Sequence, residues 1–334
     1  MHISNNSISK ILPYEFIGTL IKEIVIPEGV TIIDYNGFSN SNIEKITFPS
    51  TLNSIGNYAF ANTPCTTVIL PHVMYLLSSC FRDSNVRHIA IPPSITWIGS
   101  YCFYNITLET LILPQVSDNL YIGDFAFALL KFNNFTIPEN TNRISNQAFS
   151  ACVIEKIIFP GSVAYFGNWT LAGCSVNECI IKSGVTHLQE YSFAFSDIEK
   201  IEIPSSVIKI DQYAFMFSSI KEFLIPAQCN ISNNVFQGCY NLEKVTIGQG
   251  CIIGTDAFID CNSLRELFVH DSVMFLGNAF GNIRNTVAIM YYGASDSTIP
   301  DTINNIKQIA SIVNVTCSYT GSTFCGIYVN KLLC

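Results

Sequence analysis

The residue types that do chemistry in proteins are sparse in this chain and scattered along it. His72, His88, His187 and His270 occupy four different positions of a recurring sequence pattern, so they project in different directions and form no metal site. The stretch "HDS" at 270–272 has the residue types of a catalytic triad, but neighbours in sequence do not converge as a triad requires. Glycine-rich nucleotide loops, H-E-x-x-H and C-x-x-C are absent. We therefore expect no enzyme activity, no metal site and no cofactor.

Cysteine is the most frequent reactive side chain, with 13 copies. Most of them replace a small or apolar residue of the recurring pattern, so we expect buried, reduced thiols. An alternative stays open, because cysteines in adjacent stacked repeats, about 4.8 Å apart, fall inside the disulfide Cα window. The pairs concerned are Cys80/Cys102, Cys152/Cys174, Cys229/Cys251 and Cys239/Cys261.

The elements that position these residues come from one repeated phrase. "IEKITFPSTLNSIGNYAF" at 43–60 returns as "IEKIEIPSSVIKIDQYAF" at 198–215. The closing aromatic recurs every 21 to 24 residues, about 13 times in all. A period in this range with one short strand per unit is typical of leucine-rich repeats. The closing positions are Phe16, Phe38, Phe60, Phe81, Phe103, Phe127, Phe149, Leu171, Phe193, Phe215, Phe236, Phe258 and Phe280.

The sequence of each repeat predicts the same local structure. The alternation I-x-I indicates a strand with one buried face, and the proline after it ends that strand. The I-x-x-x-A-F spacing that follows predicts a tight helical turn with Ala and Phe inward. We predict a lead-in at 1–10, the repeat array at 11–292 and a cap at 293–334. In the cap, "PDTINNIKQIASIV" predicts a short helix, and "VTCSYTGSTFCGIYV" predicts a strand pair turned at Gly321.

The consensus "IxxIxIPxxVxxIxxxAFxxCxxLxxI" resembles the BspA-type leucine-rich repeat. One unit carries it with Ile201, Ile203, Pro204, Ala214 and Phe215. The resemblance implies an α/β repeat solenoid: a leucine-rich-repeat arc with one parallel β-sheet on the concave face and short helical turns or irregular segments on the convex face. It also implies adhesion to host matrix or cell-surface proteins, by a protein at the cell surface or secreted. The repeat with Leu171 and the stretch "SDNLYIG" depart from the consensus, so we expect a kink or bulged loop at each.

Composition and termini narrow the classes of function. The net charge of −8 argues against nucleic-acid binding, and no apolar run is long enough to insert into a membrane. The start "MHISNNSISKILPYEF" shows no secretory signal. The alternative function is therefore a cytoplasmic protein-interaction scaffold built from the same repeats.

The outward strand positions are the candidate partner site. Alternating charges such as Glu178, Lys200 and Glu222 are expected to neutralise one another along the stack. The column between the two strand isoleucines is often apolar although it faces outward, which is typical of interaction surfaces; plain β propensity is the alternative explanation. The predicted partner-binding residues are Ile158 and Ile180 at the centre, with Leu224, Phe268, Ile69 and Ile112.

Overall fold

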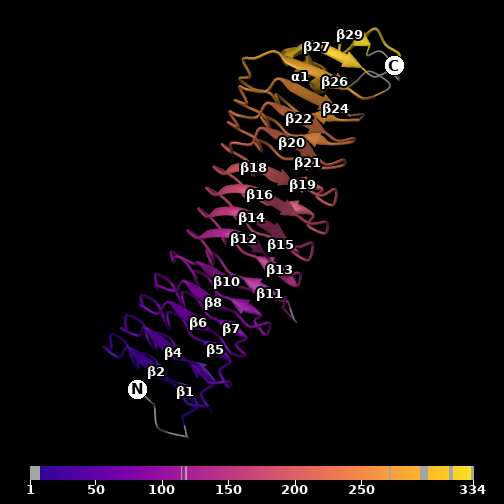
Figure 1. Ribbon diagram of the computed structural model, residues 1–334. Coiled ribbons are helices and arrows are strands. Elements are labelled where there is room, and N and C mark those ends of the chain that lie inside the picture. The colour runs from indigo at the N-terminus through magenta and orange to yellow at the C-terminus, as the bar shows by residue number, and fades with distance from the viewer. Residues whose placement is uncertain are drawn as a thin grey trace. The chain divides into compact units, whose positions relative to one another are not determined.

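The computed structural model describes residues 8–113, 115–116, 119–270, 272–293, 300–315 and 319–331. The chain forms two compact units, Met1–Cys174 and Ser175–Cys334. Each unit is a solenoid in which one sequence repeat makes one coil (Figure 1). The division between the units follows directly on the repeat that carries Leu171 instead of phenylalanine.

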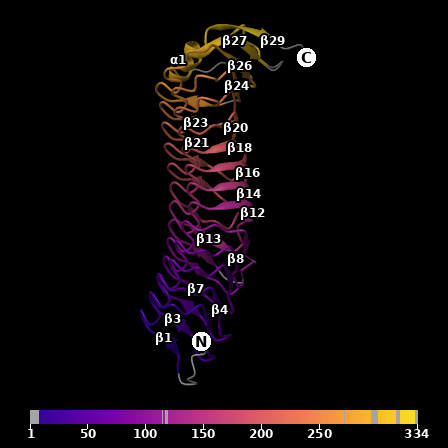
Figure 2. The same cartoon turned by 60° about the vertical axis from the view of Figure 1, so that its left-hand side comes forward.

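Each coil of the first unit adds a strand to each of two parallel ladders (Figure 2). The I-x-I ladder contains the strands foreseen from the sequence alternation, and the short ladder contains mostly two-residue strands. The I-x-I strands are β2 (Glu23–Val25), β4 (Lys45–Thr47), β6 (Thr67–Ile69), β8 (His88–Ala90), β10 (Thr110–Ile112), β12 (Lys131–Thr136) and β14 (Val153–Phe159). The short strands are β1 (Lys10–Ile11), β3 (Ile32–Ile33), β5 (Ser54–Ile55), β7 (Tyr75–Leu76), β9 (Trp97–Ile98), β11 (Leu120–Ile122), β13 (Thr141–Ile144) and β15 (Tyr165–Phe166).

The second unit repeats this arrangement and ends in a cap. Its I-x-I strands are β16 (Ser175–Ile181), β18 (Asp197–Glu202), β20 (Glu222–Ile225), β22 (Lys244–Ile247), β24 (Glu266–Val269) and β26 (Val287–Tyr291). Its short strands are β17 (His187–Leu188), β19 (Lys209–Ile210), β21 (Asn230–Ile231), β23 (Ile252–Ile253) and β25 (Met274–Phe275). The cap contains α1 (Pro300–Ile309), β27 (Ala310–Val315), β28 (Thr323–Phe324) and β29 (Ile327–Lys331).

The predicted helical turns are wrong. Among the described residues the only helix is α1, and the A-F segments are turns with a left-handed residue at every fourth position. In one coil Tyr58 and Asn62 have φ of 56° and 55°, two residues before and after Phe60. Left-handed residues turn every second N–H towards the next coil, so Phe60 N donates to Cys80 O at 2.7 Å. An α-helix would instead keep these N–H groups inside its own segment. The fold is therefore a solenoid of parallel strands with almost no helix.

The closing aromatics form a phenylalanine column in the core of each unit. In the first unit successive ring centroids from Phe16 to Phe149 lie 5.0 to 5.7 Å apart, with nearly parallel planes. In the second unit the distances from Phe193 to Phe280 are 4.9 to 5.4 Å. Parallel rings at this separation stack with an offset, which is a favourable arrangement. Within each of these two runs, successive coils thus contact each other through their closing rings.

The described cysteines are buried free thiols. Several donate to a backbone carbonyl of the preceding coil, as Cys152 Sγ does to Phe127 O at 3.0 Å and Cys261 Sγ to Phe236 O at 3.1 Å. Cys80 Sγ and Cys102 Sγ lie 3.1 Å apart without a bond between them. Burial raises the pKa of Cys102 well above its ordinary value. The thiols therefore replace the small core residues of other repeats, and Cys317 and Cys334 lie outside the described residues.

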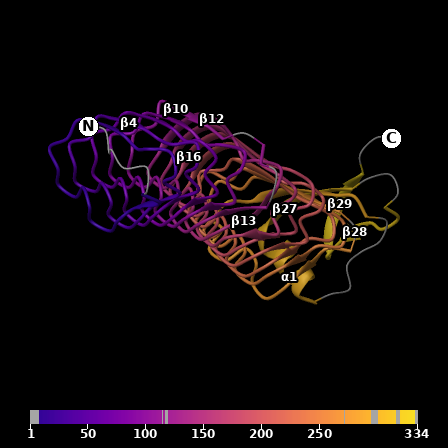
Figure 3. The same ribbon diagram turned by 90° about the horizontal axis from the view of Figure 1, so that it is seen from below.

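The helix α1 lies at the end of the second unit (Figure 3), and its side chains accept hydrogen bonds from the last coil. Thr302 Oγ1 accepts from Phe275 N at 3.1 Å, and Asn305 Oδ1 accepts from Ala279 N at 2.7 Å. Both side chains are almost fully buried. The equivalents of Ala279 in earlier coils donate within their own coil, as Ala257 N does to Gly254 O at 3.3 Å, so the hydrogen bond to Asn305 is specific to the last coil. An array of stacked repeats needs such an atypical end.

Two details of the sequence-based prediction need correction in this region. The helix ends at Ile309, and the "ASIV" that follows it is strand β27 rather than helix. The antiparallel hairpin of β28 and β29 turns at Cys325–Gly326, not at Gly321. The bulge expected at "SDNLYIG" is present there as a register shift between Leu120 and Tyr121, where β11 pairs with β13. The predicted boundaries of lead-in, array and cap stay a prediction.

Removing one ring of the phenylalanine column tests the packing. Phe215 is fully buried, with Phe193 and Phe236 at 4.9 and 5.4 Å. We expect Phe215→Ala to lower the free energy of unfolding by about 3–5 kcal/mol, because it opens a cavity between coils. Tyr240→Ala, at a side chain that is 54% exposed, should change it by less than about 1 kcal/mol. Urea unfolding followed by circular dichroism measures both. Equal losses would show that the column does not carry the stability.

Alkaline pH tests the burial of the thiols. Burial raises the pKa of Cys229 from 9.0 to about 12, with the neighbouring Cys251 as a second cause. Between these two values the folded chain keeps a proton that the unfolded chain loses, so stability falls as pH rises above about 9. Val is the common residue at this repeat position, so we expect Cys229→Val to lose less stability than the wild type as the pH rises above about 9. Unfolding curves from pH 8 to 11 measure it, and identical slopes in both proteins would contradict the burial.

Candidate protein-binding surface

The outward side chains of the I-x-I ladder form a face that we call the strand face. The alternation predicted from the sequence holds there: in β6, Val68 is buried while Thr67 and Ile69 are exposed. The six residues predicted to bind a partner all reach this face, but unequally. Ile69, Leu224 and Ile112 are exposed by 72%, 61% and 60%, whereas Ile158, Ile180 and Phe268 are half-buried.

The structure separates these six residues rather than joining them in one patch. Ile69 and Ile112 lie on either side of Ala90 in the sheet of β6, β8 and β10. In the second unit Thr246 lies between Leu224 and Phe268. Ile158 belongs to the first unit and Ile180 to the second. Their role in binding stays a prediction.

The I-x-I ladder is interrupted within the units, and the short ladder is not. In the described residues β4 does not pair with β6, β10 does not pair with β12, and β18 does not pair with β20. The short strands of the same coils remain paired, β5 with β7, β11 with β13 and β19 with β21. Phenylalanine rings also stay 5.3 to 5.4 Å apart across all three interruptions. The coils therefore separate only on the strand face.

Each interruption opens a cleft that reaches core residues. The cleft between β4 and β6 has a volume of about 620 Å³, and the clefts between β10 and β12 and between β18 and β20 have about 550 Å³ each. Strand residues that are buried elsewhere, such as Ile89 and Val245, are replaced at the clefts by half-buried ones. These half-buried residues are Ile46, Phe48, Leu111, Leu113, Phe132, Ile201 and Ile203.

A phenylalanine beside each cleft provides a physical reason for the opening. Phe223 of β20 and Phe135 of β12 occupy an inward position that otherwise holds Ile, Val, Leu or Cys. Phe223 lies 4.8 and 4.9 Å from the rings of Phe215 and Phe236, which are two successive members of the column. At the first cleft Phe48 lies edge-on to Phe60 at 5.7 Å. An oversized core side chain can force a backbone shift, although Phe159, at the repeat position of Phe48, leaves β14 paired with β12.

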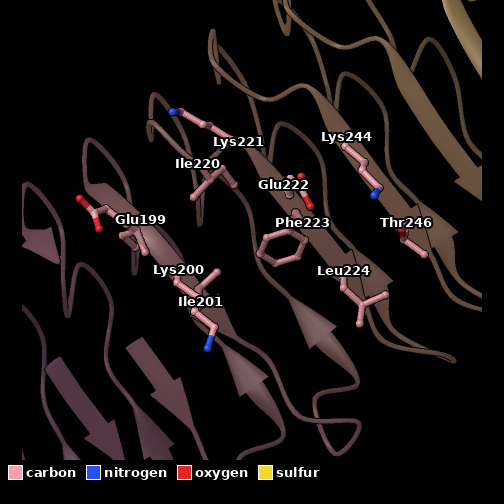
Figure 4. Close-up of a pocket in the computed structure, with 11 residues that line it drawn as sticks. Glu199, Lys200, Ile201, Ile220, Lys221, Glu222, Phe223, Leu224, Lys244 and Thr246 are labelled. Carbon is pink, nitrogen blue, oxygen red and sulfur yellow. The ribbon is translucent and has the colours of Figure 1, made fainter. Parts of the chain in front are cut away.

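The cleft between β18 and β20 combines an apolar floor with charged walls (Figure 4). Ile201 and the ring of Phe223 lie between the two strands, and Leu224 stands at the rim. Glu199, Lys221 and Glu222 border the same cleft. Such a site can receive an apolar side chain while its rim exchanges hydrogen bonds with the chain that carries it.

The alternating charges are only partly neutralised. Lys200 Nζ lies 3.2 Å from Glu178 and 2.8 Å from Glu202. These two carboxylates, Glu202 first, raise the pKa of Lys200. The expected run from Lys200 to Glu222 fails, because β18 and β20 do not pair. Charges at this cleft thus remain available to a partner.

Three of the described histidines contact other side chains and do not gather into one site. His88 Nδ1 lies 2.8 Å from Thr110 Oγ1, His187 contacts Thr186, and the ring of His270 stacks on Tyr292 at 4.9 Å. No group of three or more His, Cys, Asp or Glu side chains that could hold a metal ion occurs in the ranges that the structure describes. In the same ranges no helix has the length and apolar character needed to cross a membrane.

A second surface was missed from the sequence. The outward residues of successive short strands in the first unit form what we call the aromatic row, and they lie one position before the inward residue of each strand. That position follows no repeat consensus, so only the clustering of Trp, Tyr and Arg could have signalled it. The aromatic row contains Tyr75, Trp97, Tyr121, Arg143 and Tyr165.

Comparisons with known proteins agree with this architecture. The closely spaced repeats match the family model "BspA type Leucine rich repeat region (6 copies)" over residues 9–121, 120–243 and 229–316. Comparison with curated proteins by sequence finds no match.

Solved structures with a similar fold come from bacteria. A leucine-rich repeat protein from Bacteroides ovatus has a TM-score of 0.56 and 19% identity, with 81% of this chain and 84% of that chain covered. The pneumococcal vaccine antigen PcpA has a TM-score of 0.47 and 16% identity over 97% of this chain and 85% of that chain. The first of these supports the fold alone. Since the family model matches almost the whole chain, this protein belongs to the BspA-type leucine-rich repeat family.

Proposed function

We propose that this chain is a non-enzymatic protein-binding module that engages its partner through the strand face. The observation that carries the proposal is the position of the exposed apolar residues. Ile69, Ile112 and Leu224 are the most exposed apolar residues among the six predicted ones, and each borders one of the three clefts. The centre of binding therefore moves from Ile158 and Ile180, which are half-buried where the ladder is closed, to the clefts.

The physical basis is that each cleft offers apolar contact on a rigid support. The coils on both sides are held by the phenylalanine column and by the short ladder, so little conformational entropy is lost when a partner docks. A side chain that enters a cleft would cover half-buried residues such as Ile46 or Ile201 and remove their apolar surface from water. An exposed Leu or Ile at the rim would pack along the same side chain.

The resemblance to BspA-type proteins favours adhesion to host matrix or cell-surface proteins, by a protein at the cell surface or secreted. An intracellular protein-interaction scaffold is the alternative, and the buried free thiols favour it, because reduced cysteines are usual in reducing compartments. Labelling intact, unpermeabilised cells with an antibody to this chain separates the two. Surface label supports adhesion, and label that appears only after permeabilisation supports the scaffold.

The strand face is tested by placing a charge at the rim of a cleft. We expect Leu224→Asp and Ile69→Asp each to weaken binding to an immobilised matrix protein by at least about tenfold, because a carboxylate must lose water in an apolar contact. Immobilised fibronectin, laminin and collagen are the probes, and surface plasmon resonance measures affinity. Ile208→Asp, at a side chain that is 48% exposed on β19's side of its coil, is the matched control and should bind normally.

Circular dichroism and the melting temperature should stay unchanged in all three variants, because the substituted side chains are exposed. Loss of binding in Ile208→Asp together with the other two would show that charge anywhere weakens the contact. Full binding by both rim variants would show that the partner docks elsewhere.

A further inference from the structure

The aromatic row is a continuous surface of side chains that dominate protein interfaces. Its members come from β7, β9, β11, β13 and β15, whose backbones pair in register, so the side chains stand beside one another. Tyr75 and Trp97 are 40% and 39% exposed, and Arg143 is exposed as well. Tyr, Trp and Arg are the residue types most enriched at binding hot spots. The whole row lies in the first unit and on strands other than those of the strand face.

Arg143 is held in a fixed position by its neighbours. Its Cζ lies 4.1 Å from the ring centroid of Tyr165 and 5.6 Å from that of Tyr121. Its Nε lies 3.4 Å from Ser145 Oγ, which donates to Tyr121 Oη at 2.9 Å. The ring of Trp97 stacks on Tyr121 at 3.9 Å with an angle of 6° between planes. A guanidinium flanked by rings keeps the remaining N–H donors on its edge free for a planar acceptor.

Arg143 differs from the other cations at the same strand position. Lys10 lies 3.8 Å from Asp34, and Lys209 lies 2.6 Å from Asp211. Asp211 lies two residues after Lys209, and the residue two positions after Arg143 is Ser145. Asp34 lies in the coil that follows Lys10, and the equivalent residue in the coil that follows Arg143 is Gly167. No carboxylate of the described residues lies within ion-pair distance of Arg143. This charge therefore lacks the internal partner that neutralises its equivalents.

We propose that the aromatic row binds an acidic segment of a partner protein, whose carboxylate docks on Arg143 while an adjacent apolar side chain packs on Trp97. Arginine binds carboxylates through two parallel hydrogen bonds, and such bonds are among the strongest in proteins. Two strand spacings separate Arg143 from Trp97, which is about 10 Å. In an extended segment that distance corresponds to about three residues. The recognised pattern is then an Asp or Glu followed or preceded three positions away by an aromatic or aliphatic residue.

Other classes of ligand fit the row less well. A sugar stacks on the open face of an aromatic ring, but Trp97 and Tyr121 cover one face of each other, and Arg143 lies 5.6 Å from the ring of Tyr121. A nucleic acid or an anionic membrane needs several cations, whereas the row carries one and the chain has a net charge of −8. A protein segment needs a single cation beside apolar contact, which is what the row provides.

The test is a selection of displayed random peptides on the full chain, followed by affinity measurements on the enriched peptides made synthetically. We expect enriched peptides to carry Asp or Glu about three positions from an aromatic or aliphatic residue. Arg143→Gln and Trp97→Ala should each weaken them at least tenfold, while Lys209→Gln, a cation at the same strand position that already has its carboxylate, should bind normally. Replacing the acidic residue of the peptide by its amide should weaken wild type tenfold and leave Arg143→Gln unchanged.

Four outcomes overturn the proposal. They are enriched peptides without an acidic residue, equal affinity for wild type and Arg143→Gln, no enrichment on the wild-type chain, and Arg143-dependent binding of polygalacturonate or phosphatidylserine vesicles in place of peptides. If Arg143→Gln alters the melting temperature, a charge swap is measured in its place. It combines Arg143→Glu with a peptide whose acidic residue is changed to Lys. Restored affinity in that swapped pair supports the contact, and failure to restore it counts against the contact.

Discussion

The fold depends on one constraint, which is that every coil must stack on the next at the spacing of a parallel sheet. Strands in a sheet lie about 4.8 Å apart, and offset-stacked aromatic rings tolerate a similar separation. A phenylalanine in every repeat except that of Leu171, with centroids 4.9 to 5.7 Å apart within each unit, satisfies both requirements at once. The left-handed residues on either side of each ring complete the contact, since they direct every second N–H to the neighbouring coil.

Because the turns and the short ladder hold the coils together, the I-x-I ladder can open without loss of the stack. At the cleft between β18 and β20, Phe223 lies beside the column on the inward side of its strand, between Phe215 and Phe236. The same side chain thus contributes to the core and prevents the closure of the sheet above it. A cleft made in this way needs no insertion in the repeat.

The sequence alone predicts the parts of the structure that repeat. The period, the buried and exposed positions of β6 and the burial of cysteines such as Cys152 all follow from a pattern seen many times. The helical turns were wrong because Tyr58 and its equivalents adopt positive φ, which tyrosine rarely does and its side chain does not signal. The clefts were missed because they depend on Phe in place of Ile at an apolar position, which leaves the hydrophobic pattern unchanged. Arg143 was missed because its position has no consensus, and only the structure sets it between Tyr121 and Tyr165.

The most direct test of this account is hydrogen exchange at the cleft between β18 and β20, in the wild-type chain and in Phe223→Ile. In the closed pair of β20 and β22 the amides of Glu243 and Lys244 both donate to Lys221 O, at 2.8 and 3.2 Å. The equivalent amides at the cleft belong to Lys221 and Glu222. We predict that these two exchange faster than Glu243 and Lys244 in the wild type, and that Phe223→Ile slows them to the same rate. Equal protection in the wild type, or a cleft that stays open in Phe223→Ile, would contradict the account.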